Sequence, residues 1–373
     1  MSDNGKKMCI LHITMRWGEG RGGVKQFILN AVNSLDPDLY EQSVLSVGPI
    51  TGGDLGLDLH GPVVGRGDPL SLVLAASRLE HTIRRLAPDV VHIHCNNGLG
   101  LLYAAAARRA GCAVRVCHSH NTAVEDGCAA KRIMSFMLKR CFASAPTQRV
   151  ACSDLAGAYL FGSHEFTVVH NGIDVVRFAF DPNARRDIRA QYGIDDKAMV
   201  LGNIGSGIPV KNAGFIIDLV RVLVDSGKDV HTLLVGSGEE IAVLHNRAID
   251  GRVSDRVHFV GAVGDAWRYY SAMDAFLLPS FYEGLPISLI EAQANGLPCV
   301  ASDAVSAESN VVGLVDFLSL SSPLKVWLLK VSKAANRGAS RSAEDSLNAQ
   351  HVLSQAGFSL EALRVQLKTL YSS

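Results

Sequence analysis

Short apolar runs that are rich in β-branched residues alternate with longer amphipathic stretches along most of the chain. Such runs are typical of buried strands, whereas the longer stretches have the length and periodicity of helices. Strands that alternate with helices in this way predict a parallel sheet with helices on both of its faces. In the first half the strand-like runs lie at 8–13, 42–47, 89–94, 113–119 and 149–153, and the helical stretches at 24–35, 70–86, 100–110 and 130–143.

A second series of the same kind begins after the sequence changes character near residue 170. His170–Asp174 contains an Asn-Gly turn signal, and Phe178–Tyr192 is polar and rich in arginine, without a strand pattern. The region from 323 to 371 is helical in pattern, and Ser359 is a suitable N-cap for a last helix that ends at Leu370. Between these regions the strand-like runs lie at 199–205, 230–236, 256–261, 275–280 and 298–302, and the helical stretches at 212–224 and 286–296.

We therefore predict an α/β fold of two Rossmann-like domains, each with a doubly wound parallel sheet. The predicted domains are 1–170 and 171–355, and a C-terminal helix within 356–373 is expected to pack back toward the first domain. The chain has 373 residues, of which 48% are hydrophobic and 19% are charged. That composition can fill two cores, which excludes a single small module and a disordered chain.

The cysteines and the N-terminal segment indicate in which cellular compartment the protein is expected. The eight cysteines form no CxxC pair and lie mostly in apolar runs, which favours reduced thiols in a cytosolic protein. The N-terminal residues lead from two lysines straight into a strand-like run, without the apolar region and cleavage site of a signal peptide. The longest apolar stretch, at 99–107, is shorter than the roughly 20 residues that a membrane helix needs. Any membrane contact is therefore expected to be peripheral.

The formal net charge is zero, since 36 basic side chains balance 36 acidic ones, and this balance argues against a nucleic-acid-binding protein. The distribution is nevertheless uneven. Residues 1–170 carry 17 basic and 14 acidic side chains, a net charge of +3, and residues 171–373 carry 19 and 22, a net charge of −3. Between Arg66 and Arg149, 12 basic residues stand against five acidic ones. This excess favours an anionic partner, such as a phosphate or a membrane surface, with scattered solvated charges as the alternative.

The loops that follow the predicted strands are the candidates for chemistry, because ligands of open α/β sheets bind beyond the carboxyl ends of the strands. The first loop contains G-x-G-x-x-G at Gly18, Gly20 and Gly23, but no acidic residue ends the second strand to bind a ribose. An NAD-dependent oxidoreductase is therefore a remote alternative. Gly22 and Gly23 would let backbone amides at a helix N-terminus approach an anion, and a flexible turn is the other interpretation.

Two further loops belong to the second series of elements. Glu283 is expected just outside a helix that begins at Pro286, and Glu291 lies about one and a half turns inside it. Two carboxylates can accept hydrogen bonds from a sugar or ribose diol, although a helix cap and a solvated residue would have the same spacing. Lys211 follows the glycines of the loop at 205–212, where it could neutralise a diphosphate or lie on the surface.

Histidines gather at two strand ends of the first half, at His92 and His94 and at His118 and His120. Such a group suggests zinc, but no cysteine or carboxylate completes a tetrahedral set at short spacing. Residues two apart in a strand point to the same side. We therefore expect His92 and His118 to be hydrogen-bonded in the core, and His120, at the loop edge, to be the functional candidate.

Together these residues match a known family. The chain resembles the family 4 glycosyltransferases of the GT-B fold, and among them the subgroup of bacterial capsular and exopolysaccharide synthesis. The resemblance runs nearly end to end, and it is carried by Gly22-Gly23, 118–121 (HSHN), 151–153 (ACS), 170–174 (HNGID), 209–212 (PVKN), 235–239 (VGSGE), Glu283 to Glu291 with seven residues between them, and 317–320 (FLSL).

The resemblance implies two Rossmann-like domains that face a central cleft, the first binding the acceptor and the second the nucleotide sugar. It also implies transfer with retention of the anomeric configuration, and neither a metal nor a cofactor. Glu291 would hold the ribose hydroxyls, Glu283 the donor sugar, and Lys211 with the 284–286 backbone the diphosphate. Val263 would lie near the nucleotide base, and His120 would touch the donor sugar near the reacting carbon. The implied catalytic residues are His120, Lys211 and Glu283, and the implied donor-binding residues are Gly22, Gly23, Gly205, Ser206, Lys211, Val263, Glu283, Gly284, Leu285, Pro286 and Glu291.

The function that follows is transfer of a hexose, from a UDP-linked donor, to a lipid-linked oligosaccharide during cell-surface polysaccharide synthesis. The protein is expected in the cytoplasm at the inner face of the plasma membrane, where the basic helix 130–142 could contact anionic lipid. One departure matters, because the family normally has arginine where this chain has Ser206. A weak or inactive paralogue that binds nucleotide sugar is therefore the alternative.

Overall fold

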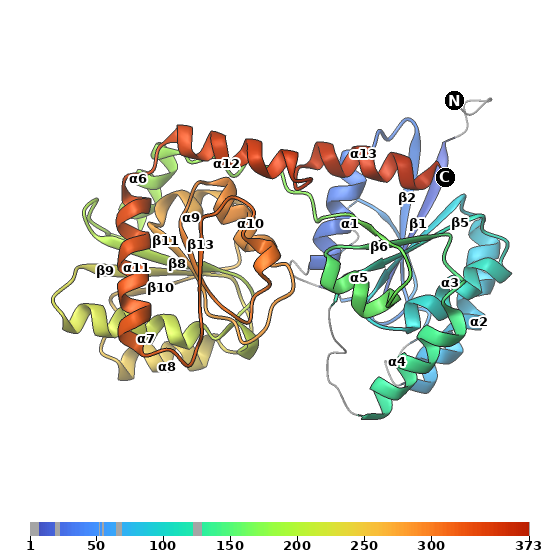
Figure 1. The fold of residues 1–373 in the computed structure, drawn as a ribbon, viewed down its shortest axis with the longest axis horizontal. Helices are drawn as coiled ribbons and strands as arrows, with labels where there is room; N and C mark the ends of the chain where they lie inside the picture. The colour runs from blue at the N-terminus through green and yellow to red at the C-terminus, as the bar shows by residue number, and fades with distance from the viewer. Residues whose placement is uncertain are drawn as a thin grey trace. The chain divides into compact units, whose positions relative to one another are not determined.

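The computed structural model describes residues 7–18, 23–51, 53, 56–64, 69–121 and 129–372. The chain divides into two compact units, Met1–Gly172 with Leu360–Ser373, and Ile173–Ser359. Each unit has a wholly parallel sheet flanked by helices, which confirms the predicted fold class (Figure 1). No helix in the described ranges is both long and apolar enough to cross a membrane.

The sheet of the first unit has the strand order β3-β2-β1-β4-β5-β6-β7, so the order reverses between β1 and β4. A reversal of this kind opens a crevice at the carboxyl ends of the two central strands. The strands are β1 (Met8–Thr14), β2 (Tyr40–Ser46), β3 (Asp58–His60), β4 (Val90–Cys95), β5 (Val114–Ser119), β6 (Gln148–Ala151) and β7 (Thr167–Val168). The helices are α1 (Gly23–Ser34), α2 (Pro69–Leu86), α3 (Leu99–Arg109), α4 (Ala129–Phe142), α5 (Asp154–Phe161) and α13 (Leu360–Tyr371).

The last helix, α13, belongs to the first unit although it follows the second unit in sequence. It packs against α1, as Figure 1 shows by its red ribbon beside a blue one. Leu363, Leu367 and Tyr371 are buried there in one apolar cluster with Ile10 and Phe27. The amphipathic pattern of the helix is thus explained by a core that it completes.

The sheet of the second unit has the order β10-β9-β8-β11-β12-β13 and reverses between β8 and β11. Its strands are β8 (Met199–Ile204), β9 (Val230–Val235), β10 (Val257–Gly261), β11 (Ala275–Leu278), β12 (Cys299–Ser302) and β13 (Val315–Leu318). Its helices are α6 (Pro182–Gln191), η1 (Pro209–Lys211), α7 (Ala213–Asp225), α8 (Ile241–Asp250), α9 (Ala266–Ala272), α10 (Ile287–Ala294), η2 (Ala307–Ser309), α11 (Leu324–Ala339) and α12 (Ala343–Gln355).

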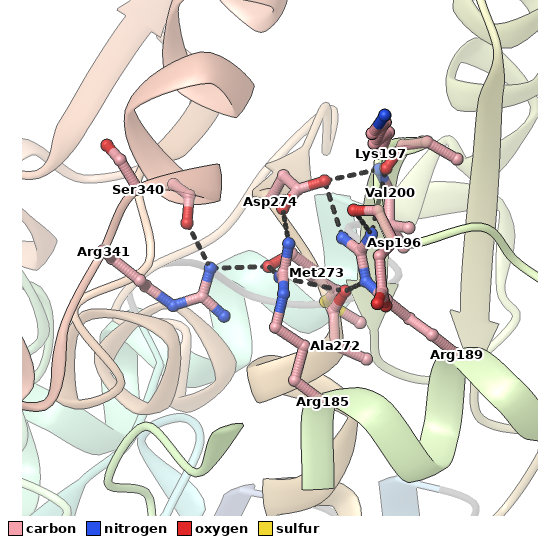
Figure 2. A network of polar contacts seen from close by, with 12 residues as sticks. Arg185, Arg189, Asp196, Lys197, Val200, Ala272, Met273, Asp274, Ser340 and Arg341 are labelled. Atoms are coloured by element: carbon pink, nitrogen blue, oxygen red, sulfur yellow. Dashed lines mark hydrogen bonds and ion pairs between the residues drawn. The ribbon is translucent and has the colours of Figure 1, made fainter. Parts of the chain in front are cut away.

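A buried arginine network explains why the polar stretch before β8 folds as α6 (Figure 2). Arg185 and Arg189 of this helix each place a guanidinium nitrogen on Asp274, at 2.6 and 2.8 Å, and Asp274 also accepts the Val200 amide at 2.8 Å. Arg341 donates to backbone carbonyls beside Asp274, including that of Met273 at 2.6 Å. Because Asp274 and Arg189 are almost fully buried, the pair replaces water with hydrogen bonds that fix α6 on the sheet.

Replacing Asp274 with asparagine should therefore destabilise the protein strongly. Asp274→Asn leaves buried arginines without their counter-charge, and we expect the free energy of unfolding to fall by about 3–5 kcal/mol. Asp187→Asn is the matched control, since it breaks a 3.2 Å surface pair between α6 and Arg268 and should cost less than about 1 kcal/mol. Urea unfolding followed by circular dichroism measures both. Equal stability of the two variants would contradict the network's role.

Candidate functional site

The loops after β8 and β11 meet because these strands are neighbours at the point where the sheet reverses. The Phe281 amide donates to the Val210 carbonyl at 2.9 Å, and the Asn212 side chain donates to the Pro279 carbonyl at 3.0 Å. These bonds join the loop that carries Lys211 to the loop that carries Glu283. Two motifs far apart in sequence therefore form one edge of the second unit.

Lys211 and Glu283 form an ion pair at this edge, with side chains that are 18% and 16% exposed. The Ser280 hydroxyl also donates to Glu283, at 3.3 Å, and the amide of Ser306, in the loop after β12, donates to the Glu283 carbonyl at 3.2 Å. Because the lysine ammonium has three N–H donors, Lys211 can contact an incoming anion while it stays paired with Glu283. The structure thus brings these two predicted site residues into direct contact.

Glycines let two backbone loops touch beside this pair. A side chain on Gly236, whose φ is +136°, would lie 1.8 Å from the Gly205 carbonyl oxygen, and one on Gly238 would lie 2.3 Å from the Gly207 oxygen. Only glycine permits these approaches. At these points the backbones of the two loops touch next to Lys211, with no side chain between them. Ser206 lies in this loop with an exposed side chain.

The loop 284–286 leads into α10, and here one detail of the sequence prediction is wrong. Pro286 is the N-cap, with extended φ and ψ of −71° and 116°, and the helix begins at Ile287. Because proline has no amide hydrogen, the amides nearest to the helix entrance come from neighbouring residues. Within the described ranges, the amides of Gly284 and Leu285 have no protein acceptor. Amides before a helix N-terminus can bind an anion.

Glu291 lies in α10, and Val263 lies in the loop after β10. The Tyr270 hydroxyl donates to Glu291 Oε2 at 2.7 Å and contacts the Ser288 carbonyl at 3.1 Å, so it orients the carboxylate against the helix. Val263 and Leu285 are both partly buried against the core cluster of the unit. Tyr270 was not among the sequence candidates, since a buried tyrosine in an apolar helix has no distinctive pattern.

The remaining predicted residues belong to the first unit. Gly23 begins α1, whereas Gly22 lies outside the described residues. His120 follows β5, half-buried, and its amide donates to the Cys95 carbonyl at 3.0 Å. Burial lowers the pKa of His120 to about 3, because desolvation disfavours the imidazolium. The ring is therefore neutral at physiological pH.

His120 is the outermost of five histidines at the strand-order reversal of the first sheet. His92 and His118 are fully buried and bonded to each other at 3.3 Å, as expected for core histidines. His94 lies between His120 and His12, at 3.0 and 3.1 Å. His12 was missed by sequence reasoning. The register that pairs His12 with His92 across β1 and β4 is the signal that identifies it.

Comparison with known proteins gives the family. A model of glycosyl transferases group 1 matches residues 184–314, and a model of the glycosyl transferase 4-like domain matches residues 22–177. EpsF of Bacillus subtilis (strain 168), which is named as a glycosyltransferase, is 32% identical over 357 residues that cover 90% of each chain. The chain belongs to the family 4 glycosyltransferases.

Two further proteins are similar to this family 4 glycosyltransferase. The Escherichia coli UDP-Gal:alpha-D-GlcNAc-diphosphoundecaprenol alpha-1,3-galactosyltransferase is 28% identical over 225 residues, 58% of each chain. The crystal structure of Anabaena HepE in complex with UDP and glucose has a TM-score of 0.77 at 20% identity, and the match covers 98% of this chain and all of HepE. That structural likeness establishes the GT-B fold.

Proposed function

We propose that this family 4 glycosyltransferase transfers a hexose from a UDP-linked sugar to a lipid-linked oligosaccharide, with retention of configuration and without a metal. The observation that carries the proposal is one edge of the second unit. There Lys211, Glu283 and the amides of Gly284 and Leu285 lie beside the two touching glycine loops. The E. coli relative supports the chemistry, since its name states a UDP-galactose donor and a diphosphoundecaprenol acceptor.

In this proposal each group meets one part of the donor. The amides of the α10 entrance and Lys211 neutralise the diphosphate, Glu291 accepts from the ribose hydroxyls, and Glu283 accepts from the sugar. The bond between the anomeric carbon and the phosphate oxygen breaks while the acceptor oxygen bonds to that carbon on the same face. The acceptor's proton passes to the departing phosphate oxygen, so positive charge fixed around the diphosphate supplies the main stabilisation. The reaction then requires no enzyme base.

The nucleotide site can be tested by calorimetry with UDP, GDP and NAD. We expect UDP to bind to the wild-type protein, and Glu291→Ala to weaken that binding roughly 10- to 100-fold, because charge-assisted bonds to the ribose are lost. Glu308→Ala, which removes an exposed carboxylate in η2, is the control and should bind UDP normally.

Two results would contradict this assignment. Binding of NAD but not UDP would favour the oxidoreductase, and equal UDP affinity in the two variants would remove Glu291 from the site. UDP release in the presence of a lipid-linked acceptor then separates a transferase from a paralogue that only binds its nucleotide sugar.

Restoring the family's arginine should strengthen the proposed diphosphate site. Ser206 has an exposed side chain in the loop that precedes Lys211, so an arginine there meets no buried neighbour. We expect Ser206→Arg to raise kcat/KM for the donor by up to about 30-fold, the value of one charge-assisted bond. Steady-state kinetics with the donor varied gives this value, with Ser206→Gln as the uncharged control of similar reach. An unchanged or lower kcat/KM in Ser206→Arg would contradict the proposed diphosphate contact.

We infer that α4 binds the anionic inner face of the plasma membrane, near the lipid-linked acceptor. Ile133, Phe136 and Met137 are 64%, 57% and 53% exposed, and their spacing puts them on one helix face. Arg132 and Arg140 are exposed on the same helix. An apolar face flanked by cations fits the boundary between headgroups and acyl chains. An ordinary amphipathic surface helix would instead turn these apolar side chains toward the core of the domain.

Flotation with phosphatidylglycerol-containing liposomes tests this inference. We expect the wild-type protein to float with these vesicles at low salt and less at high salt, because both apolar burial and charge contribute. Replacing Ile133 and Phe136 with serine should abolish flotation. Leu329→Ser, at a position of α11 that is 71% exposed, should leave flotation unchanged. Binding that is equal on neutral vesicles, or insensitive to salt, would contradict the inference.

A further inference from the structure

The hydrogen bonds of three histidines in the first unit run in a line from Gln42 to His120, which we call the histidine relay (Gln42, His12, His94 and His120). His12 Nε2 lies 3.1 Å from Gln42 Oε1, and His12 Nδ1 lies 3.1 Å from His94 Nε2. His94 Nδ1 in turn lies 3.0 Å from His120 Nε2. Each inner ring thus uses both nitrogens, one toward each neighbour.

The Gln42 end of the relay has a defined polarity. Its amide nitrogen donates to the Val32 carbonyl at 3.3 Å, so its oxygen is the atom that faces His12. A carbonyl oxygen only accepts hydrogen bonds, which requires that His12 carry its proton on Nε2. The protonation of the first ring is therefore set by a side chain that does not titrate.

This polarity passes along the relay because the rings are neutral. Burial lowers the pKa of His12 to about 4 and that of His94 well below its usual value. The neighbouring histidines lower the pKa of His94 further. A neutral imidazole has one N–H, so His12 Nδ1 accepts from His94 Nε2. His94 Nδ1 then accepts from His120 Nε2, which leaves His120 Nδ1 without a proton.

We propose that Gln42, His12 and His94 are positioning residues that hold His120 in the tautomer with an unprotonated Nδ1, and that sugar transfer uses the lone pair of this nitrogen. The second half of this statement rests on the proposed function. Within the described ranges His120 Nδ1 has no hydrogen-bond partner. A lone pair attracts the positive charge that develops at the anomeric carbon, whereas an N–H at the same place would repel it.

A metal ion is the competing explanation for the same nitrogens. Two sets, His12 with His92 and His94, and His94 with His118 and His120, each place ring nitrogens within 4.8 Å of one another. Zinc requires its ligand nitrogens to converge on one point at about 2.0–2.1 Å. The pairwise geometry of the relay favours hydrogen bonds, since the two nitrogens of His94 face different partners. Bound metal is therefore an outcome that the experiment must detect.

The tautomer can be measured directly in the full-length protein. Long-range 1H–15N correlation spectra of histidine-labelled protein distinguish protonated from unprotonated ring nitrogens, and the His120→Asn spectrum assigns His120. We expect His120 with an unprotonated Nδ1 and a protonated Nε2 at neutral pH. A protonated Nδ1 in the wild-type protein would overturn the proposal without any relay variant. So would one equivalent of zinc in the purified protein, measured by plasma mass spectrometry.

Variants of Gln42 test the origin of the preference. Gln42→Met removes the acceptor, so His120 should populate both tautomers, whereas Gln42→Glu keeps an acceptor oxygen and should retain one. Gln148→Met, at a half-buried position of β6 in the same sheet, is the matched control and should match the wild type. A single unchanged tautomer in folded Gln42→Met would overturn the relay.

Kinetics then tests the catalytic half of the proposal. The kcat of Gln42→Met should fall in proportion to the fraction of molecules in the wrong tautomer, roughly twofold for an even mixture, and Gln42→Glu should restore it. A wild-type kcat despite mixed tautomers would overturn the link to the sugar. If the wild-type protein transfers no sugar, the proposed function fails while the tautomer measurement still decides the relay.

Discussion

One topological constraint determines where both units place their chemistry. In a parallel sheet the strand order can reverse, and the connections that leave the two central strands then diverge to opposite faces and open a crevice at the strand ends. In the second unit this happens between β8 and β11, which places Lys211 against Glu283 across 72 residues of sequence. In the first unit it happens between β1 and β4, which pairs His12 with His92. The shared geometry accommodates opposite contents, a charged edge in one unit and neutral imidazoles in the other.

The contrast between the units also clarifies what bulk charge means in this protein. The second half of the chain has a net charge of −3, yet its edge combines a lysine, paired with Glu283, with backbone amides that carry no formal charge. Local dipoles and a single cation act at hydrogen-bond distance, where total charge has little influence. In the first half the positive excess is carried partly by α4, whose exposed face also has large apolar side chains. A net charge of zero is therefore the sum of two halves with different charge distributions.

The pattern of apolar runs predicts the long elements well, because strands and helices that cover a core must repeat their apolar positions. The short strands β3 and β7 and the helix α5 are too brief to show such a repeat. The pattern of apolar runs does not predict helix α6 either, for another reason. Arg189 is a polar residue in the sequence but is 1% exposed in the structure, where Asp274, just before β11, pairs with it.

The candidate site shows the same division. Residues in the loops after strands, such as Lys211 and Glu283, could be identified because motifs mark them and topology gathers them. Their partners could not, since Tyr270 and His12 lie inside apolar segments and differ from ordinary core residues only through contacts across the fold. Tyr371 is the extreme case, because its hydroxyl meets His92 over 279 residues of sequence.

The return of α13 to the first unit has a consequence for how the chain folds during synthesis. Residues up to 172 leave the ribosome first, but the apolar cluster around Ile10 and Phe27 still lacks Leu363, Leu367 and Tyr371. Ile173–Ser359 form a unit with its own core, which can close as soon as it emerges. The first unit is thus synthesised first but completes its core last. Until α13 packs against it, the apolar cluster around Ile10 and Phe27 stays exposed to solvent and to chaperones.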